Sequence, residues 1–232
     1  MKDSDSRTRK DLAELGGGLD LSNLSDRVYI HIKRLIMTGK LQGGQKIPEQ
    51  AIAEQLGASR TPIREALRRL EEHGLVVIEP RRSTRVATIT LDDKKHVGQV
   101  RLQLSLLAIR LLCERVSSED CTTLRDLAVS CSEYAEAGDF ASCFETDSLF
   151  HCEISERSGN EHLAELDRLL EHKVQLLRNI EKATRERVIE TVSLHIPIVE
   201  AICLKDAGKA KELMYQHLVC YYPGLEAFKD MV

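Results

Sequence analysis

The chain has 232 residues, a formal net charge of −4 and 42% hydrophobic residues. This length suits two domains that each bury a core of their own. No segment approaches the ~18 apolar residues of a membrane-spanning helix, and the first 23 residues are charged and glycine-rich, unlike an apolar signal core. We therefore expect a soluble, cytoplasmic protein with two domains and a flexible tail over residues 1–23.

Charge is divided unequally along the chain. Residues 24–90 contain 12 Lys and Arg against 7 Asp and Glu, whereas residues 91–232 contain 17 against 25. The total charge alone would argue against nucleic acid as a partner. A basic segment can nevertheless approach phosphate groups, and the acidic segment should face away from them.

The cysteines show no pattern typical of a metal or disulfide framework. There are seven, at positions 113, 121, 131, 143, 152, 203 and 220, and no two have the C-x-x-C spacing. Their number is odd. We expect reduced thiols that pack as small apolar side chains in a reducing cytoplasm, without disulfide bridges.

Residues 24–90 have the pattern of three helices and a β-hairpin. Apolar residues recur at helical spacing over 26–38, with Ser25 as the expected cap, and a second helix opens at Pro48 and closes at Gly57. A third helix follows Ser59 and runs to Leu70. Short apolar strands at 75–78 and 84–88 flank a turn. The segment is predicted to be a winged helix-turn-helix domain.

The third helix is apolar on one side and cationic on the other. Its apolar side consists of Ile63, Ala66, Leu67 and Leu70. Thr61, Arg64 and Arg68 point the opposite way, where an arginine can bind the O6 and N7 atoms of guanine. Alternatively, these arginines only solvate the helix and pair with neighbouring glutamates. The basic turn that contains Arg81 and Arg82 favours DNA, because it adds phosphate or minor-groove contacts beside the helix.

The ordered residues of this segment resemble the GntR family of regulators. The resemblance is carried by GQKIPE at 44–49, LGASRTPIREALRRL at 56–70 and GLV at 74–76. It implies that Ser59, Arg60, Thr61 and Arg64 contact a DNA operator and that the wing tip lies near the minor groove. The chain departs from the family at Gln50, where relatives often have an arginine, and at the Pro80-Arg81 turn, where a glycine is common.

Residues 91–232 show helical periodicity and no strand-like alternation. Helices are predicted at 92–116, 119–137, 139–158, 160–182, 185–205 and 207–221, separated by turns at Gly138, Gly159 and Gly208. The fold class is therefore mostly α, with the winged domain followed by an all-α antiparallel helical bundle. Bundles of this kind hold ligands in their cores.

Four polar residues stand out in otherwise apolar helical segments of the bundle. Asp147 and His151 are four residues apart and so share one helical face, while His195 and His217 come from two later segments. Three imidazoles and a carboxylate suit a divalent transition metal, Zn²⁺ or alternatively Ni²⁺, with coordination positions open for an oxygen ligand. The alternative is that each is a hydrogen-bonded core histidine. Pro197 should kink its helix or mark its start.

The bundle also resembles the FCD sensor domain of the FadR-type branch of the GntR family. The residues that carry the resemblance are DSLFH at 147–151, SGN at 158–160, His195 with Ile198, and MYQHL at 214–218. It implies that the Asp and three His bind a metal and that a small carboxylate effector binds against it. Arg101 and Asn160 are the matching effector residues, whereas Ser105 replaces a glutamate found in a relative.

These features predict a homodimeric, DNA-binding transcription regulator that recognises a near-palindromic operator under control of a small organic acid. Two alternatives remain at this point. The Asp and His set could activate water in a metal enzyme, although no general base lies beside it in the pattern. The metal itself could also be the signal.

Overall fold

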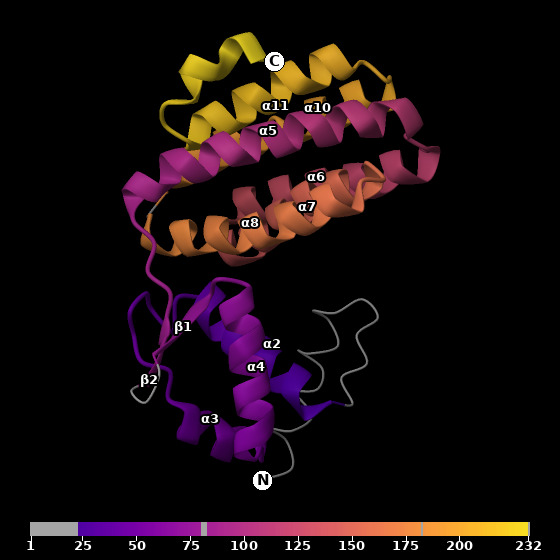
Figure 1. The fold of residues 1–232 in the computed structure, drawn as a ribbon. Coiled ribbons are helices and arrows are strands. Elements are labelled where there is room, and N and C mark those ends of the chain that lie inside the picture. The colour runs from indigo at the N-terminus through magenta and orange to yellow at the C-terminus, as the bar shows by residue number, and fades with distance from the viewer. Residues whose placement is uncertain (1–22, 80–82, 182, 232) are drawn as a thin grey trace. The chain divides into compact units, whose positions relative to one another are not determined.

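A computed structural model describes residues 23–79, 83–181 and 183–231. They form two compact units, the first ending at Thr88 and the second beginning at Ile89 (Figure 1). The predicted fold class, a winged helix-turn-helix followed by an all-α bundle, is confirmed. The predicted tail covers residues 1–23; residues 1–22 lie outside the described residues, and Asn23 is the N-cap of the helix that begins at Leu24.

The first unit is built on the packing of two helices. Its helices are α2 (Leu24–Met37), α3 (Glu49–Leu56) and α4 (Arg60–Glu72). The apolar faces of α2 and α4 meet through side chains such as Ile32 and Leu70, which are fully buried. Asn23 caps α2 by accepting a hydrogen bond from the Ser25 backbone N–H. The prediction of Ser25 as the cap was wrong, because the helix begins two residues earlier.

The wing is a two-stranded antiparallel hairpin of β1 (Val76–Glu79) and β2 (Ser83–Val86). Val76 pairs with Val86 at its base, and a β-bridge from Lys46 to Arg85 joins the loop before α3 to β2. The same loop is held by a 2.9 Å hydrogen bond from the Ile47 N–H to the Thr84 carbonyl. These bonds anchor the base of the wing to the helices.

The second unit contains seven α-helices in its described part, and the predicted segments fall on them. They are α5 (Leu91–Arg115), α6 (Ser118–Ala137), α7 (Phe140–Arg157), α8 (Glu161–Ile180), α9 (Arg185–Val192), α10 (His195–Cys203) and α11 (Ala207–Tyr221), followed by the 3₁₀ helix η1 (Leu225–Met231). Within this unit, α5, α10 and α11 lie in one layer, and α6, α7 and α8 in another (Figure 1). A shared apolar core fills the space between them.

The helix predicted over 185–205 is two helices. It breaks at Ser193 and Leu194, so that α10 starts at His195. Pro197 is the third residue of α10, where a backbone N–H would have no partner within the helix. The proline therefore marks a helix start, one of the two outcomes expected for it.

A disulfide bond joins α6 to α10 through Cys121 and Cys203. The expectation that all cysteines are unpaired thiols was wrong for these two residues. They are 82 positions apart in the chain, but α6 and α10 pack together and bring their Cα atoms to 5.7 Å. That separation is within the range a disulfide requires. The other five cysteines are free.

Gly98 on α5 lets the side chain of Tyr222 lie directly against the helix backbone. A Cβ atom at position 98 would lie 2.6 Å from Tyr222 Cβ and Cγ. We expect Gly98→Ala to lower the free energy of unfolding by about 1–3 kcal/mol, because the buried tyrosine ring has to move. Gly208→Ala on α11 is the control, since its nearest contact is an ordinary 3.6 Å. Denaturant unfolding of both variants measures the difference, and equal stabilities would contradict the close packing.

Candidate functional site

The helical unit brings the four predicted metal ligands together. α7 supplies Asp147 and His151, while His195 opens α10 and His217 lies on α11. Their candidate ligand atoms all lie within 4.8 Å of one another, and no side chain of the four is more than about 4% exposed. Residues up to 70 positions apart in the sequence thus lie together in one buried cluster.

Hydrogen bonds fix the orientation of one imidazole. His217 Nδ1 donates to the Thr191 carbonyl at 2.9 Å, because a carbonyl oxygen only accepts. The Nε2 atom of His217 therefore carries a lone pair, and it lies 3.1 Å from His151 Nε2. A backbone acceptor behind a histidine is the arrangement that orients metal ligands in proteins.

His195 is a buried polar group with unused bonding capacity. Neither of its ring nitrogens makes a hydrogen bond, although Nε2 lies 3.3 Å from Asp147 Oδ1. Leaving such a nitrogen unsatisfied costs free energy in the interior. A cation bound at the cluster would satisfy it.

The surroundings hold His151, His217 and Asp147 in the protonation states that a metal would need. Burial lowers the pKa of His151 well below its usual value, and the positive charge of Arg101 is the second cause. Burial also lowers the pKa of His217, to about 3, with His195 as the second cause. Burial alone would raise the pKa of Asp147, but Arg178 holds it well below its ordinary range. His151 and His217 are therefore neutral and the Asp147 carboxylate is ionised at neutral pH, as metal ligation requires.

The two oxygens of Asp147 face different partners. Oδ2 is paired with Arg178 from α8 and lies 3.9 Å from the Arg101 guanidinium of α5. Oδ1 faces the imidazoles, 3.3 Å from His195 and 4.0 Å from His151. The carboxylate is thus anchored through one oxygen and presents the other to the cluster.

Sequence reasoning missed the charged residues that α8 contributes to the core. Glu171 pairs with Arg101, and both are buried, while Arg178 pairs with Asp147. Burial raises the pKa of Glu171, although Arg101 opposes the shift. The sequence held one signal for these two residues. Positions 171, 174 and 178 are spaced so that Glu171 and Arg178 lie on the same helical face as the buried Val174.

A small cavity of about 40 Å³ lies beside the cluster. Asp147 and His217 contribute to its wall, as do three arginines, Arg101, Arg178 and Arg187. This volume has room for roughly three water molecules. A small anion is the ligand that guanidinium groups in this arrangement would favour.

The two predicted effector residues lie in different places. Arg101 lines the cavity, with its guanidinium held by Glu171. Asn160 is elsewhere: its side chain accepts a hydrogen bond from the Leu163 N–H and caps α8, and it lines a separate groove with Arg115 and His162. The structure does not bring Asn160 to the cavity.

The predicted DNA-reading residues lie on the exposed side of α4. Arg60, Thr61, Arg64 and Arg68 are all exposed, and Ser59 occupies the N-cap position without a side-chain capping bond.

The exposed arginines of α4 are not held in ion pairs with neighbouring glutamates. No ion pair in the described part of the chain involves Arg64 or Arg68, and the neighbouring Arg69 pairs with Asp26 instead. Glu71 accepts a hydrogen bond from the Ile78 N–H rather than binding an arginine. The alternative of locally paired arginines is not realised, which leaves these groups available to a ligand. Arg81 and Arg82 lie outside the described residues.

A winged helix-turn-helix joined to a helical bundle with a buried Asp and His cluster defines a class of bacterial transcription regulators. Residues 24–86 match the family of bacterial regulatory proteins called the gntR family, and residues 96–219 match the FCD domain. The chain belongs to the GntR family and carries an FCD domain. It is a DNA-binding transcription regulator and not an enzyme.

Individual relatives agree with this assignment. The chain is 28% identical over 193 residues to the uncharacterized HTH-type regulator YdhC of Bacillus subtilis, covering 82% of this chain and 85% of YdhC. It is 30% identical over 155 residues to the Nta operon transcriptional regulator of Aminobacter aminovorans, covering 66% and 72%.

Solved structures show the same fold. Escherichia coli McbR/YncC superposes with a TM-score of 0.75 at 24% identity, covering 85% of this chain and 94% of McbR. A GntR regulator from Rhodococcus sp. RHA1 gives a TM-score of 0.73 at 20% identity, over 84% and 93%. Among the described residues, no helix has the length and apolar character to cross a membrane.

The four-residue cluster predicts the metal content of the purified protein. We expect roughly one divalent ion per chain by elemental analysis, and its loss in the double variant His151→Ala/His195→Ala, because two of four ligands are removed. His162→Ala is the matched control, since this histidine lies on α8 away from the cluster. Metal that remains at full occupancy in the double variant would place it at another site.

Proposed function

We propose that the chain is a cytoplasmic, homodimeric regulator whose affinity for a near-palindromic operator is set by a small organic acid bound beside a resident metal ion. The observation that carries this proposal is the arginine-lined cavity against the buried Asp147, His151, His195 and His217 cluster. In this proposal the winged unit binds the operator and the cavity binds the effector.

The donor set fits Zn²⁺, with Ni²⁺ as the second choice. Three imidazoles and one carboxylate are ligands that suit borderline divalent ions. When bound, such an ion supplies a Lewis-acid position to which a carboxylate oxygen of an effector can coordinate. Full burial of the four ligands favours a slowly exchanging cofactor over a metal signal.

The residues of the cavity suit an effector with a carboxylate group. Arg178 and Arg101 already share the charge of Asp147, and Arg101 also neutralises Glu171. Arg187 on α9 lines the same cavity, and its guanidinium donates to the Cys220 carbonyl at 2.9 Å rather than to a carboxylate. Arg187 is therefore the cation best placed to bind an incoming acid.

Dimerisation is supported by the surface of the helical unit. Val100 on α5 and Leu166 on α8 are both more than half exposed, at 51% and 55%. Where exposed apolar side chains form a contiguous patch, they mark a protein–protein interface, and a second copy would cover such a patch here. Two recognition helices in a dimer would then read the two half-sites of the operator. An effector can change operator affinity only by binding the DNA-competent and incompetent states differently.

Arg64 is the residue with which to test DNA reading. We expect Arg64→Ala to weaken binding to an operator selected from random DNA by at least ~1 kcal/mol relative to non-specific DNA, because a base contact is lost. Arg110→Ala is the control, since Arg110 is also an exposed helical arginine and lies in the other unit. Titration and footprinting at one fixed salt concentration measure both variants. A footprint and affinity unchanged by Arg64→Ala would exclude Arg64 as a reader.

A thermal-shift screen of small mono- and dicarboxylic acids on metal-loaded protein tests the sensor. At a concentration of about 100 times its Kd, an effector should raise the Tm by roughly 5–10 °C, because it binds only the native state.

Substitution of Arg187 tests the cavity itself. We expect Arg187→Ala to weaken effector binding about tenfold. Arg185→Ala on the same helix should leave binding unchanged, since the Arg185 guanidinium donates to the Glu136 carbonyl away from the cavity. Equal effects of the two variants would argue against the cavity.

A further inference from the structure

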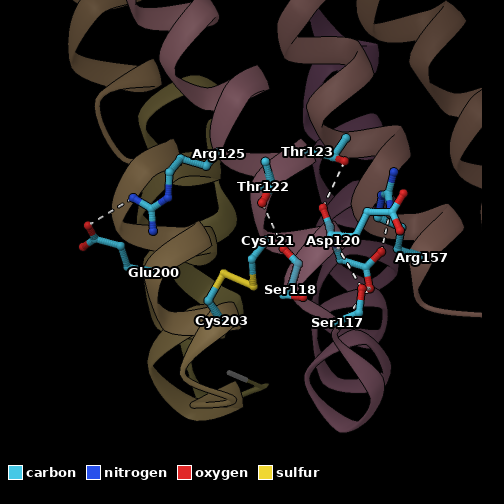
Figure 2. The surroundings of a disulfide bond; sticks show 11 residues. Ser117, Ser118, Asp120, Cys121, Thr122, Thr123, Arg125, Arg157, Glu200 and Cys203 are labelled. Atoms are coloured by element: carbon cyan, nitrogen blue, oxygen red, sulfur yellow. Dashed lines mark hydrogen bonds and ion pairs between the residues drawn. A yellow bond between two sulfur atoms is a disulfide. The ribbon is translucent and has the colours of Figure 1, made fainter.

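The Cys121–Cys203 bond joins two helices that position the ligand cluster. Cys203 is the last residue of α10, and the first residue of that nine-residue helix is His195. Cys121 lies in the opening turn of α6, which packs against α7, the helix that carries Asp147 and His151. Figure 2 shows the two sulfur atoms bridging between the helices.

The surroundings of the bond leave it open to small reagents. Cys121 and Cys203 are both partly exposed, and the residues that follow Cys203, Leu204 and Lys205, are exposed. By contrast, the other close pair of thiols, Cys131 and Cys143, is fully buried with its sulfur atoms 3.7 Å apart. A dissolved oxidant or reductant therefore reaches the first pair and not the second.

Besides the bond, α10 contacts α6 through apolar packing and one ion pair. An ion pair between Arg125 and Glu200 spans the same two helices at 3.8 Å, and both side chains are about half exposed (Figure 2). Ion pairs of this kind contribute little to stability. The bond therefore adds a covalent link to the apolar packing that holds the C-terminal end of α10.

We propose that Cys121 and Cys203 form a reversible, peroxide-oxidised thiol pair that fixes α10 against α6 when bridged and releases it when reduced. In a reducing cytoplasm, bridges of this kind are typically transient and used for sensing. The pair adds a redox input to the proposed regulator, and it requires neither a bound metal nor an effector.

The chemistry balances with hydrogen peroxide as the oxidant. The Cys121 thiolate attacks one peroxide oxygen, the O–O bond breaks, and the departing hydroxide takes a proton to become water, leaving a sulfenic acid. The Cys203 thiolate then attacks that sulfur, forming the S–S bond and releasing a second water after protonation. Two thiols are oxidised and one peroxide is reduced to two waters.

Cys121 is suited to be the attacking thiolate. It is in the first turn of α6, where the helix dipole favours a negative charge. The adjacent Asp120 carboxylate would oppose this, but it is paired with Arg157 (Figure 2). In the reverse direction, a thiol such as glutathione opens the bond by thiol–disulfide exchange.

The first test uses the folded, full-length protein without substitutions. Glutathione at a cytoplasmic ratio of reduced to oxidised forms should open the bond, and one equivalent of hydrogen peroxide should close it again. Peptide mass spectrometry after alkylation of free thiols should then find only the 121–203 linkage. A bond that persists in glutathione, or a different linkage after peroxide, would overturn the proposal.

The second test measures the constraint on α10. Hydrogen–deuterium exchange over residues 195–203 should be severalfold faster in the reduced than in the oxidised protein. Cys203→Ser should exchange like the reduced protein in either condition, whereas Cys220→Ser, which removes another partly exposed thiol, should respond like the unsubstituted chain. Identical exchange in the two wild-type states would overturn the coupling. Operator and effector binding are measured on reduced protein, where the disulfide is absent. Failure of the redox proposal therefore leaves the proposed regulator function standing, and the reverse also holds.

Discussion

The buried carboxylate of Asp147 is the point on which the helical unit depends. An ionised carboxylate in the interior costs several kcal/mol unless it is paired. Here the compensating groups come from different helices, with Arg178 on α8 and Arg101 on α5. Removing one partner from such an arrangement typically costs about 3–5 kcal/mol. Charge balance thus requires α5, α7 and α8 to keep their positions, and the same requirement leaves one oxygen of Asp147 facing the histidines.

Glu171 contributes to the arrangement in which the two oxygens of Asp147 face different partners. By pairing with Arg101, it satisfies a second guanidinium that would otherwise compete for Asp147. Arg101 consequently stays 3.9 Å from Oδ2, and Oδ1 remains directed toward His195 and His151. The buried ion pairs therefore orient the cluster, whereas a buried ion pair is by itself weak evidence for net stabilisation.

Much of the fold could be predicted from the sequence, because helical periodicity and glycine stops are local signals. The four residues of the cluster were found for the same reason, since imidazoles in apolar segments contrast with their neighbours. Glu171 and Arg178 were missed because a charge on a helix usually indicates a solvated face, and only the partner in space reveals otherwise. The Cys121–Cys203 bond was missed because nothing local relates two residues 82 positions apart. Asn160 was carried over from a family pattern, and its actual contact is a helix cap.

The short helix α9 acts on the cluster through its backbone. Thr191 provides the carbonyl that holds the proton of His217 on Nδ1, and its hydroxyl donates to the Arg187 carbonyl one turn earlier. Arg187 reaches into the cavity from that same turn. No side-chain substitution at position 191 can delete the carbonyl acceptor, but a displacement of the turn can withdraw it. A ligand that displaced Arg187 would also displace this turn, and with it the carbonyl that orients His217, a residue of the same cavity wall.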